Sequence, residues 1–273
     1  MPRRLLGLLL VLPALTVILF LFVLPLALSV IGAFETEAGY GFGNFTKSFA
    51  LYSSDILFTV VIVSLSTCLI GLFSIAIGGY LTLGENPRAV AILRWLYRWP
   101  LFIPFIVVGQ VLRTFLAKNG LMNNILVGAG LITPLQAVSF LDWRGIVIAF
   151  VWKQTPFVTL LLAGAMASVD RGTIEAARNL GASRLRILIE ILVPQVATTL
   201  MVGLVLSFVT MMSVLSVPLM INAQSPTMLT ADIAFRINAY GDYGVANALG
   251  LISLAATACV AWFYLRQSMK ERG

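Results

Sequence analysis

Six long apolar stretches limit what this chain can fold into more than any other feature. Each is close to the length of roughly 20 residues that a helix needs to cross about 30 Å of hydrocarbon, where backbone groups must hydrogen bond within their own segment. We predict membrane spans at approximately residues 5–33, 56–83, 99–117, 145–169, 195–221 and 243–265. The sequence therefore predicts an all-α polytopic membrane protein, with residues 1–273 forming one domain.

Composition supports this interpretation, because 60% of the residues are hydrophobic and only 11% are charged. The predicted spans contain two charges, Arg113 and Lys153. The first stretch follows Arg3 and Arg4 as a secretory signal would, but its apolar run far exceeds the roughly 7 to 15 residues of a signal core. We therefore expect it to be retained as the first helix.

The basic residues predict the orientation of the chain. The formal net charge is +7, but Lys and Arg are distributed by loop and do not form one basic face for nucleic acid. Four lie in the loops predicted to be outer: Lys47, Lys118, Arg144 and Arg236. Twelve lie in the predicted inner segments: Arg3, Arg4, Arg88, Arg94, Arg98, Arg171, Arg178, Arg184, Arg186, Arg266, Lys270 and Arg272. The excess of basic residues in the predicted inner segments predicts that both termini are cytoplasmic.

Several kinds of chemistry are excluded or disfavoured. The chain has no histidine, which removes histidine-based triads, zinc ligands and proton relays. Cys68 and Cys259 lie in the middle of predicted spans, where a disulfide is not expected. The sequence lacks a G-x-x-x-x-G-K-[ST] phosphate loop. We predict no catalytic, cofactor-binding or metal-binding residue in this chain.

Local signals predict the connections and the helix packing. The glycine-rich residues 35–55 should form an irregular outer loop, and residues 119–134 a short outer helix. Three glycines of the second span should allow a neighbouring helix to approach closely, and two prolines should bend the start of the third span. These residues are Gly71, Gly78, Gly79, Pro100 and Pro104.

The segment 170–194, which from Ile174 onward reads IEAARNLGASRLRILIEILVP, is the one strongly charged insert in the chain. Asp170 and Ser183 are typical N-caps, and Gly181 suits a left-handed helix end. The insert should therefore form two short helices, the second interrupted at Pro194. In the second helix, apolar residues repeat at helical spacing: Leu185, Leu188, Ile189 and Leu192.

This apolar face needs cover that water does not supply, and the charges keep the insert out of the bilayer. A partner protein is the first alternative for that cover. The second is a membrane surface on which the insert lies as an amphipathic loop.

The order and spacing Glu175-Ala176-Ala177, three residues, Gly181, nine residues, Ile191 and Pro194 resembles the EAA loop of binding-protein-dependent ABC importer permeases. Val193 departs from the leucine usual in that motif. The resemblance covers approximately residues 56–265. It implies a type I importer (MetI-like) permease fold of six helices and a subgroup that transports polyamines, iron, thiamine, sulfate or phosphonates.

The resemblance also implies a function, which is ATP-driven solute import without enzymatic activity in this chain. The short helix of the insert would sit in a groove of a separate ATP-binding subunit, present in two copies and holding ATP and Mg²⁺. A second permease, identical or not, and an external solute-binding protein would complete an inner-membrane complex. The implied coupling residues are Glu175, Ala176, Ala177, Arg178, Gly181, Ala182 and Pro194.

Lys153 lies deep in the fourth predicted span and is a candidate for the solute pathway, because an intramembrane charge is costly. Its alternatives are snorkelling or pairing with a carboxylate of another subunit, and Arg113 is expected to snorkel. Lys153 would favour an anionic solute, whereas the outer Asp232 and Asp242 would favour a cation. The identity of the solute stays open.

Two other functions compete with the importer interpretation. A secondary transporter or channel without an ATPase predicts acidic residues inside the spans, but every Asp and Glu lies outside them. An intramembrane protease of six helices would lack its usual histidine base.

Overall fold

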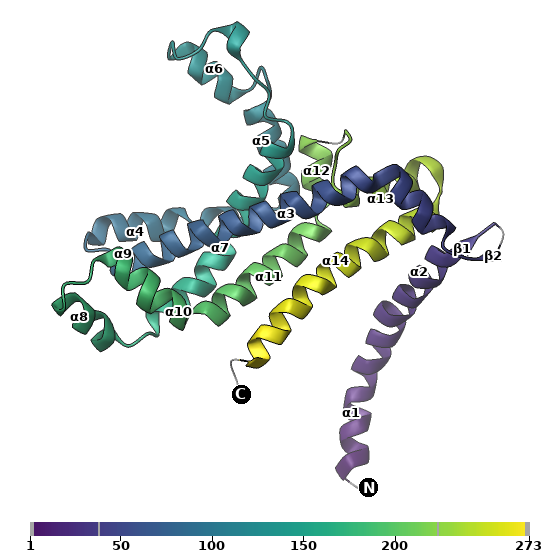
Figure 1. The fold of residues 1–273 in the computed structure, drawn as a ribbon, viewed down its shortest axis with the longest axis horizontal. Coiled ribbons are helices and arrows are strands. Elements are labelled where there is room, and N and C mark those ends of the chain that lie inside the picture. The colour runs from purple at the N-terminus through teal and green to yellow at the C-terminus, as the bar shows by residue number, and fades with distance from the viewer. Residues whose placement is uncertain (1–2, 38, 223, 271–273) are drawn as a thin grey trace. The chain divides into compact units, whose positions relative to one another are not determined.

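A computed structural model describes residues 3–37, 39–222 and 224–270 of the chain (Figure 1). Most of this part is helical, and its strands form one hairpin of two residues each, β1 (Glu35–Thr36) and β2 (Gly39–Tyr40). The first helices are α1 (Arg3–Ile18), the π-turn η1 (Leu19–Val23), α2 (Leu24–Phe34), α3 (Gly43–Leu83), α4 (Pro87–Leu96), the 3-10 turn η2 (Trp99–Phe102), α5 (Phe105–Leu116) and α6 (Leu121–Gly128).

The remaining elements follow in chain order. They are η3 (Pro134–Gln136), α7 (Trp143–Ala167), α8 (Arg171–Asn179), α9 (Arg184–Ile187), the π-turn η4 (Leu188–Leu192), α10 (Val193–Gln195), α11 (Ala197–Ser213), α12 (Ser216–Ile221), α13 (Leu229–Phe235), η5 (Arg236–Tyr240) and α14 (Tyr243–Lys270). The chain divides into two compact units. Unit 1 comprises Met1–Ser54 and Asp232–Ala255, and unit 2 comprises Asp55–Ala231 and Ala256–Gly273.

The predicted fold class is confirmed. In the described part of the chain, four helices are long and apolar enough to cross a membrane, and the number rises to six if each of two bent pairs is one span. The four lie within residues 11–34, 43–83, 143–167 and 243–262. That all 273 residues form one domain stays a prediction.

The third and fifth predicted spans are each broken. The helices at Pro87–Phe102 and Phe105–Gly128 meet at 106°, and those at Arg184–Gln195 and Ala197–Ser213 meet at 76°. Pro100 lies in the 3-10 turn η2 and Pro104 is the N-cap of α5, so the predicted proline bend is present. The cause is that neither proline has an N–H to donate, which interrupts the helical ladder there.

The prediction of an irregular loop over residues 35–55 is wrong for its second half, because α3 already begins at Gly43 and bends at Tyr52. Only the hairpin follows an irregular path, with Gly39 at φ +110°. The Asn44 amide donates to the carbonyl oxygens of Ala33 (3.1 Å) and Glu35 (2.7 Å), which ties the start of α3 to the end of α2. Glycine content predicted the turn but not where it ends.

Two apolar clusters form the core of unit 2. In the larger, Phe150 of α7 packs with residues of α5, α11 and α12, including Val108, Met211 and Val217. Figure 1 shows α11 running beside α7, and residue contacts join the two helices. The smaller cluster gathers Leu83, Leu162, Met166, Ile174, Ile187, Leu192 and Val196. It lies where α3 and α7 end and the charged insert begins.

A buried carboxylate holds the segment that follows α12. Asp55, only 2% exposed, accepts hydrogen bonds from the backbone N–H of Thr227 (2.7 Å) and the hydroxyl of Ser225 (3.1 Å). One turn further along α3, the Thr59 hydroxyl accepts from the N–H of Leu229 (2.9 Å). Residues 225–229 are thereby fixed against α3, although they form no regular structure before α13.

We expect Asp55→Ala to lower the free energy of unfolding of the purified protein by about 2 kcal/mol, because it leaves a buried N–H without its charged acceptor. Ser225→Ala is the matched control, since it removes one bond from the same carboxylate at an exposed residue and should cost less than about 1 kcal/mol. Thermal and denaturant unfolding in detergent would measure both. Equal losses in the two variants would show that the carboxylate does not fix this segment.

Candidate functional site

The charged insert begins as a capped helix. The Asp170 carboxylate accepts from the N–H of Gly172 (3.1 Å) and from the Thr173 hydroxyl (3.4 Å). The predicted cap is therefore present, although α8 starts at Arg171, two residues before the predicted start. Ser183 caps the second helix by accepting from the N–H of Arg186 (3.3 Å), also as predicted.

Gly181 lets the chain turn between the two helices. Its φ is +83°, in the left-handed region that a side chain disfavours. The Gly181 N–H donates to the carbonyl of Arg178 (2.9 Å), and the Ala182 N–H donates to that of Ala177 (3.0 Å). This pair of bonds is a Schellman motif, which satisfies carbonyls that the helix end would otherwise leave free. The turn is therefore a fixed elbow and not a loose linker.

Helix α8 presents three different faces. Ile174 is buried and Ala177 is half-buried, and both belong to the smaller cluster. Arg171, Glu175 and Arg178 follow one another at helical spacing and line a cavity. Ala176 and Leu180, the latter 88% exposed, lie on neither of these faces. Glu175 forms no ion pair with Arg178 or with any other residue that the structure describes.

The second helix of the insert packs on Gly79 of α3, one of the glycines at which the sequence predicts close approach of a neighbouring helix. A Cβ built on Gly79 would lie 2.7 Å from the Leu188 methyl groups, and one on Gly78 would lie 3.4 Å from the Met166 sulfur. A larger residue at Gly79 requires the Leu188 side chain to move, because such contacts are well inside the normal packing distance. Arg184 also forms an ion pair with Glu85, just beyond the end of α3.

The predicted apolar face of the second helix is partly wrong. Leu192 is buried and Leu188 is half-buried, but Leu185 is 65% exposed and Ile189 57% exposed. Ile187 takes a place in the core that the pattern did not predict. The π-turn η4 begins at Leu188 and adds a residue to one turn, so it rotates only the residues from there onward, and Leu185 and Ile187 precede it.

Pro194 does not interrupt the helix as predicted. The π-turn ends just before it, and the Val193 N–H donates to the carbonyl of Leu188, five residues back. This wider turn accommodates a proline that would clash in a regular helix. The break comes at Val196, with φ −107° and ψ 9°, where α11 departs at 76° from the preceding helix.

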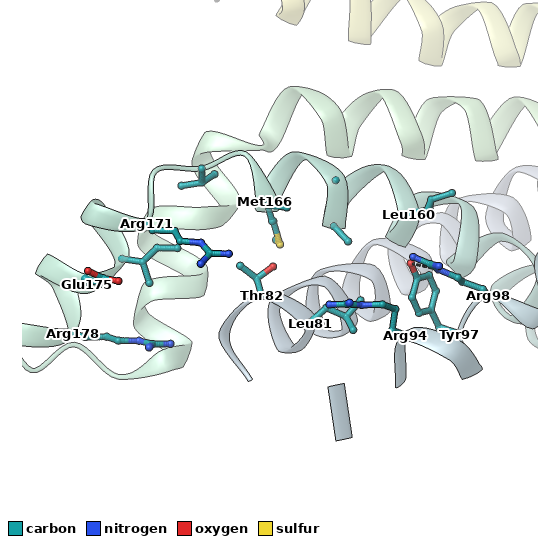
Figure 2. Close-up of a pocket in the computed structure, with 15 residues that line it drawn as sticks. Leu81, Thr82, Arg94, Tyr97, Arg98, Leu160, Met166, Arg171, Glu175 and Arg178 are labelled. Atoms are coloured by element: carbon teal, nitrogen blue, oxygen red, sulfur yellow. Dashed lines mark hydrogen bonds between the residues drawn. The ribbon is translucent and has the colours of Figure 1, made fainter. Parts of the chain in front are cut away.

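A cavity of about 560 Å³ opens between α8, α4 and the adjoining ends of α3 and α7. Figure 2 shows Arg171 and Arg178 on one side of it and Arg94, Tyr97 and Arg98 on the other. The Arg98 guanidinium donates to the Tyr97 hydroxyl (3.2 Å). No sequence signal predicts this cavity, because its arginines come from two segments that are far apart in the chain.

Lys153 is buried in α7 and its ammonium group is already paired. Its Nζ donates to the carbonyl oxygens of Pro100 and Leu101, each at 2.9 Å, and lies 5.5 Å from the ring centroid of Phe105. Of these two carbonyls, that of Pro100 also accepts from the backbone N–H of Ile103 (3.3 Å) at the end of the 3-10 turn η2. Arg113, in contrast, is exposed in the last turn of α5, as snorkelling requires.

Three buried hydroxyls of α7 and α11 make no hydrogen bond within the described structure: those of Thr155 and Thr159 on α7 and of Ser207 on α11. Sequence reasoning missed them, since Thr and Ser in a membrane helix usually bond to the carbonyl four residues back. Among the described residues no group of three acidic or cysteine side chains could hold a metal ion. Cys68 and Cys259 are both free, as predicted.

In unit 1, Asp242 is surrounded by basic side chains. Lys47 Nζ lies 2.8 Å and Arg236 Nη1 3.5 Å from its carboxylate. Burial raises the pKa of Asp242, but the hydrogen bonds from Lys47 and the Val245 N–H and the two nearby cations outweigh it, so the pKa lies below its ordinary value. Asp232 is buried, at 7% exposed. Neither carboxylate is therefore a free anionic site for a cation.

We expect Lys153→Met to lower the free energy of unfolding by about 1–3 kcal/mol, because it removes the buried ammonium donor from the carbonyls of Pro100 and Leu101. Arg113→Met, an equal loss of charge at an exposed position, should change it by less than about 0.5 kcal/mol. Unfolding of both purified variants in detergent tests this. Unchanged stability of Lys153→Met together with altered transport would instead place Lys153 in the solute pathway alone.

Comparison with known proteins identifies this architecture. Over residues 74–270 the chain matches the family described as binding-protein-dependent transport system inner membrane component. It is 30% identical to the trehalose/maltose permease protein MalF of Thermococcus litoralis, over 96% of this chain and 92% of that one. It is also 30% identical to the spermidine/putrescine permease protein PotB of Escherichia coli, but over 55% of each chain.

A crystal structure of a bacterial alginate ABC transporter, in complex with an alginate pentasaccharide-bound periplasmic protein, contains a chain of the same fold. The TM-score is 0.83 at 21% identity, over 98% of this chain and 95% of that one. The fold, the EAA spacing and the family match agree, and this chain belongs to the binding-protein-dependent ABC importer permeases.

Proposed function

We propose that this permease subunit imports a sugar or short oligosaccharide and that α8 couples it to a separate ATP-binding subunit. The observation that carries the sugar assignment is the 30% identity to a trehalose/maltose permease over nearly the whole of both chains. The alginate transporter that shares the fold was also crystallised with a saccharide-bound periplasmic protein. This proposal differs from the solutes that the EAA-loop resemblance implied, which did not include a sugar.

A polyamine is the alternative solute, favoured by the resemblance to PotB over about half of each chain. A polyamine site needs carboxylates that are free to pair with ammonium groups. Asp242 is already paired with Lys47, and Asp232 is buried. These two carboxylates therefore give the alternative little support.

Sugars are bound mainly through hydrogen bonds to their hydroxyls. The buried hydroxyls of Thr155, Thr159 and Ser207 have no partner in the described structure and lie on α7 and α11. Separation of these two helices would expose them to a passing solute. In this proposal Lys153 has one ammonium proton left beyond its two bonds to carbonyls, so it also remains a candidate for the pathway.

The coupling proposal is supported by the way α8 is mounted. Its inner face is fixed in the smaller cluster, Gly181 fixes the elbow, and the outward Ala176 and Leu180 are available to a partner. A partner that pushes on α8 would move a rigid element packed against both α3 and α7. The change it can drive equals the difference in its contacts between the two states.

We infer an assembly of two ATP-binding subunits, a second permease and an external solute-binding protein in the cytoplasmic membrane. We assign ATP and Mg²⁺ to the ATP-binding subunits, because this sequence contains no phosphate loop. The basic residues at one end of the spans support a cytoplasmic position for α8 and for both termini.

We expect Glu175→Ala and Gly181→Ala to reduce both solute uptake and solute-stimulated ATP hydrolysis of the reconstituted complex about tenfold or more. An alanine in place of Gly181 would need a left-handed conformation that costs about 1–2 kcal/mol, which distorts the elbow. Gly128→Ala is the matched control, because Gly128 has a negative φ and nothing within 4 Å of an added Cβ. Full activity in both coupling variants, with normal assembly, would contradict the proposal.

The solute is tested by uptake of labelled maltose, trehalose and spermidine into vesicles that contain the complex, its binding protein and internal ATP. We expect saturable, ATP-dependent uptake of a sugar and no competition by excess spermidine. Saturable uptake of spermidine with no uptake of either sugar would favour the polyamine alternative. An inactive phosphate-loop variant of the ATP-binding subunit controls for leakage.

A further inference from the structure

The cavity beside α8 concentrates positive charge. Its lining includes four arginines, Arg94, Arg98, Arg171 and Arg178, against one carboxylate, that of Glu175. Four positive charges and one negative charge leave a formal charge of +3. Within the described part of the chain, none of these arginines forms an ion pair. Such an excess is costly unless an anion neutralises it.

The arginines converge from opposite walls. Figure 2 shows Arg171 and Arg178 reaching from α8 towards the side from which Arg94 extends. Arg178 makes only a long hydrogen bond, 3.5 Å, to the carbonyl of Leu83. Guanidinium groups have planar pairs of donors that match the oxygens of a phosphate, so this arrangement suits a phosphate-bearing anion.

Apolar residues also line the cavity. They are Leu81 of α3 and Leu160, Ala163, Gly164 and Met166 of α7. Free inorganic phosphate gains nothing from this surface, whereas an acyl chain does. The cavity therefore combines arginines with apolar side chains in its lining.

Aromatic residues place the cavity at the depth of lipid headgroups. Trp95 and Trp99 follow directly after Arg94 and Arg98, they are 61% and 55% exposed, and their ring centroids are 4.6 Å apart. Exposed tryptophans are enriched at the membrane–water interface. Basic pockets between helices on the cytoplasmic side are suited to anionic headgroups.

We propose that this cavity binds an anionic phospholipid of the cytoplasmic leaflet. Its phosphodiester lies between the arginines of α4 and α8, and an acyl chain lies along Leu81, Leu160 and Met166. Because Arg171, Glu175 and Arg178 belong to the coupling helix, the lipid would join that helix to the membrane. The assignment to the cytoplasmic leaflet rests on the proposed orientation of the chain. The binding of the lipid does not depend on which solute is transported.

The test measures lipid that remains bound to the protein, together with any subunits that co-purify. Protein from bilayers of equal phosphatidylglycerol and phosphatidylcholine is examined by native mass spectrometry. We expect the native protein to retain phosphatidylglycerol, and Arg94→Gln and Arg171→Gln each to retain it about fivefold less, since one arginine near a lipid surface contributes about that factor. Arg88→Gln, on α4 but outside the cavity lining, should retain the native amount.

Three results would overturn the proposal. One is equal retention of phosphatidylglycerol and phosphatidylcholine by the native protein. Another is equal loss of lipid in Arg88→Gln and Arg94→Gln. The third is release of the bound lipid by inorganic phosphate at physiological ionic strength, which would assign the site to a free anion. Thermal unfolding and size-exclusion profiles identify any variant that has not folded, and the second cavity variant then decides. A negative result for lipid binding would not contradict the proposed transport function, which the uptake and ATP hydrolysis assays test separately.

Discussion

The packing of η4 and α7 against two adjacent glycines of α3 is the contact on which the site depends. Leu188 occupies space that a side chain at Gly79 would fill, and Met166 lies against Gly78. Ile174 and Ile187 complete this cluster from the insert. The charged insert is therefore not an appendage on a loop. Its apolar residues form part of the core of the membrane domain, and its charged residues lie on the faces that this packing leaves uncovered.

The breaks in the helices are stabilised by charged side chains that hydrogen bond to backbone groups at those breaks. In hydrocarbon an unpaired carbonyl costs several kcal/mol, so a break must bring its own partners. The ammonium group of Lys153 serves the carbonyls of Pro100 and Leu101, and Asp55 serves the N–H of Thr227. A charge inside a span is thus explained first by the irregular backbone that it binds.

Much of this arrangement could be predicted from the sequence, because the signals are local. Apolar length predicted the spans, Asp170 and Ser183 predicted the caps, and Gly181 predicted the elbow. The EAA spacing indicated the family. The π-turn at Leu188–Leu192 was not predictable, since no residue type specifies one. Features that depend on residues distant along the chain, such as the contact of Lys153 with Pro100 or the grouping of the arginines around the cavity, also could not be predicted from a periodic pattern.

The burial of Val196 makes the joint between the insert and α11 stiff. The helix of the insert and α11 meet at this single residue, which is 3% exposed and packed within the smaller cluster. A joint surrounded by water bends at little cost, but bending here must displace Leu192 and its neighbours. A rotation of the insert would consequently change the tilt of α11, because the packed residues around Val196 do not allow the joint to bend independently.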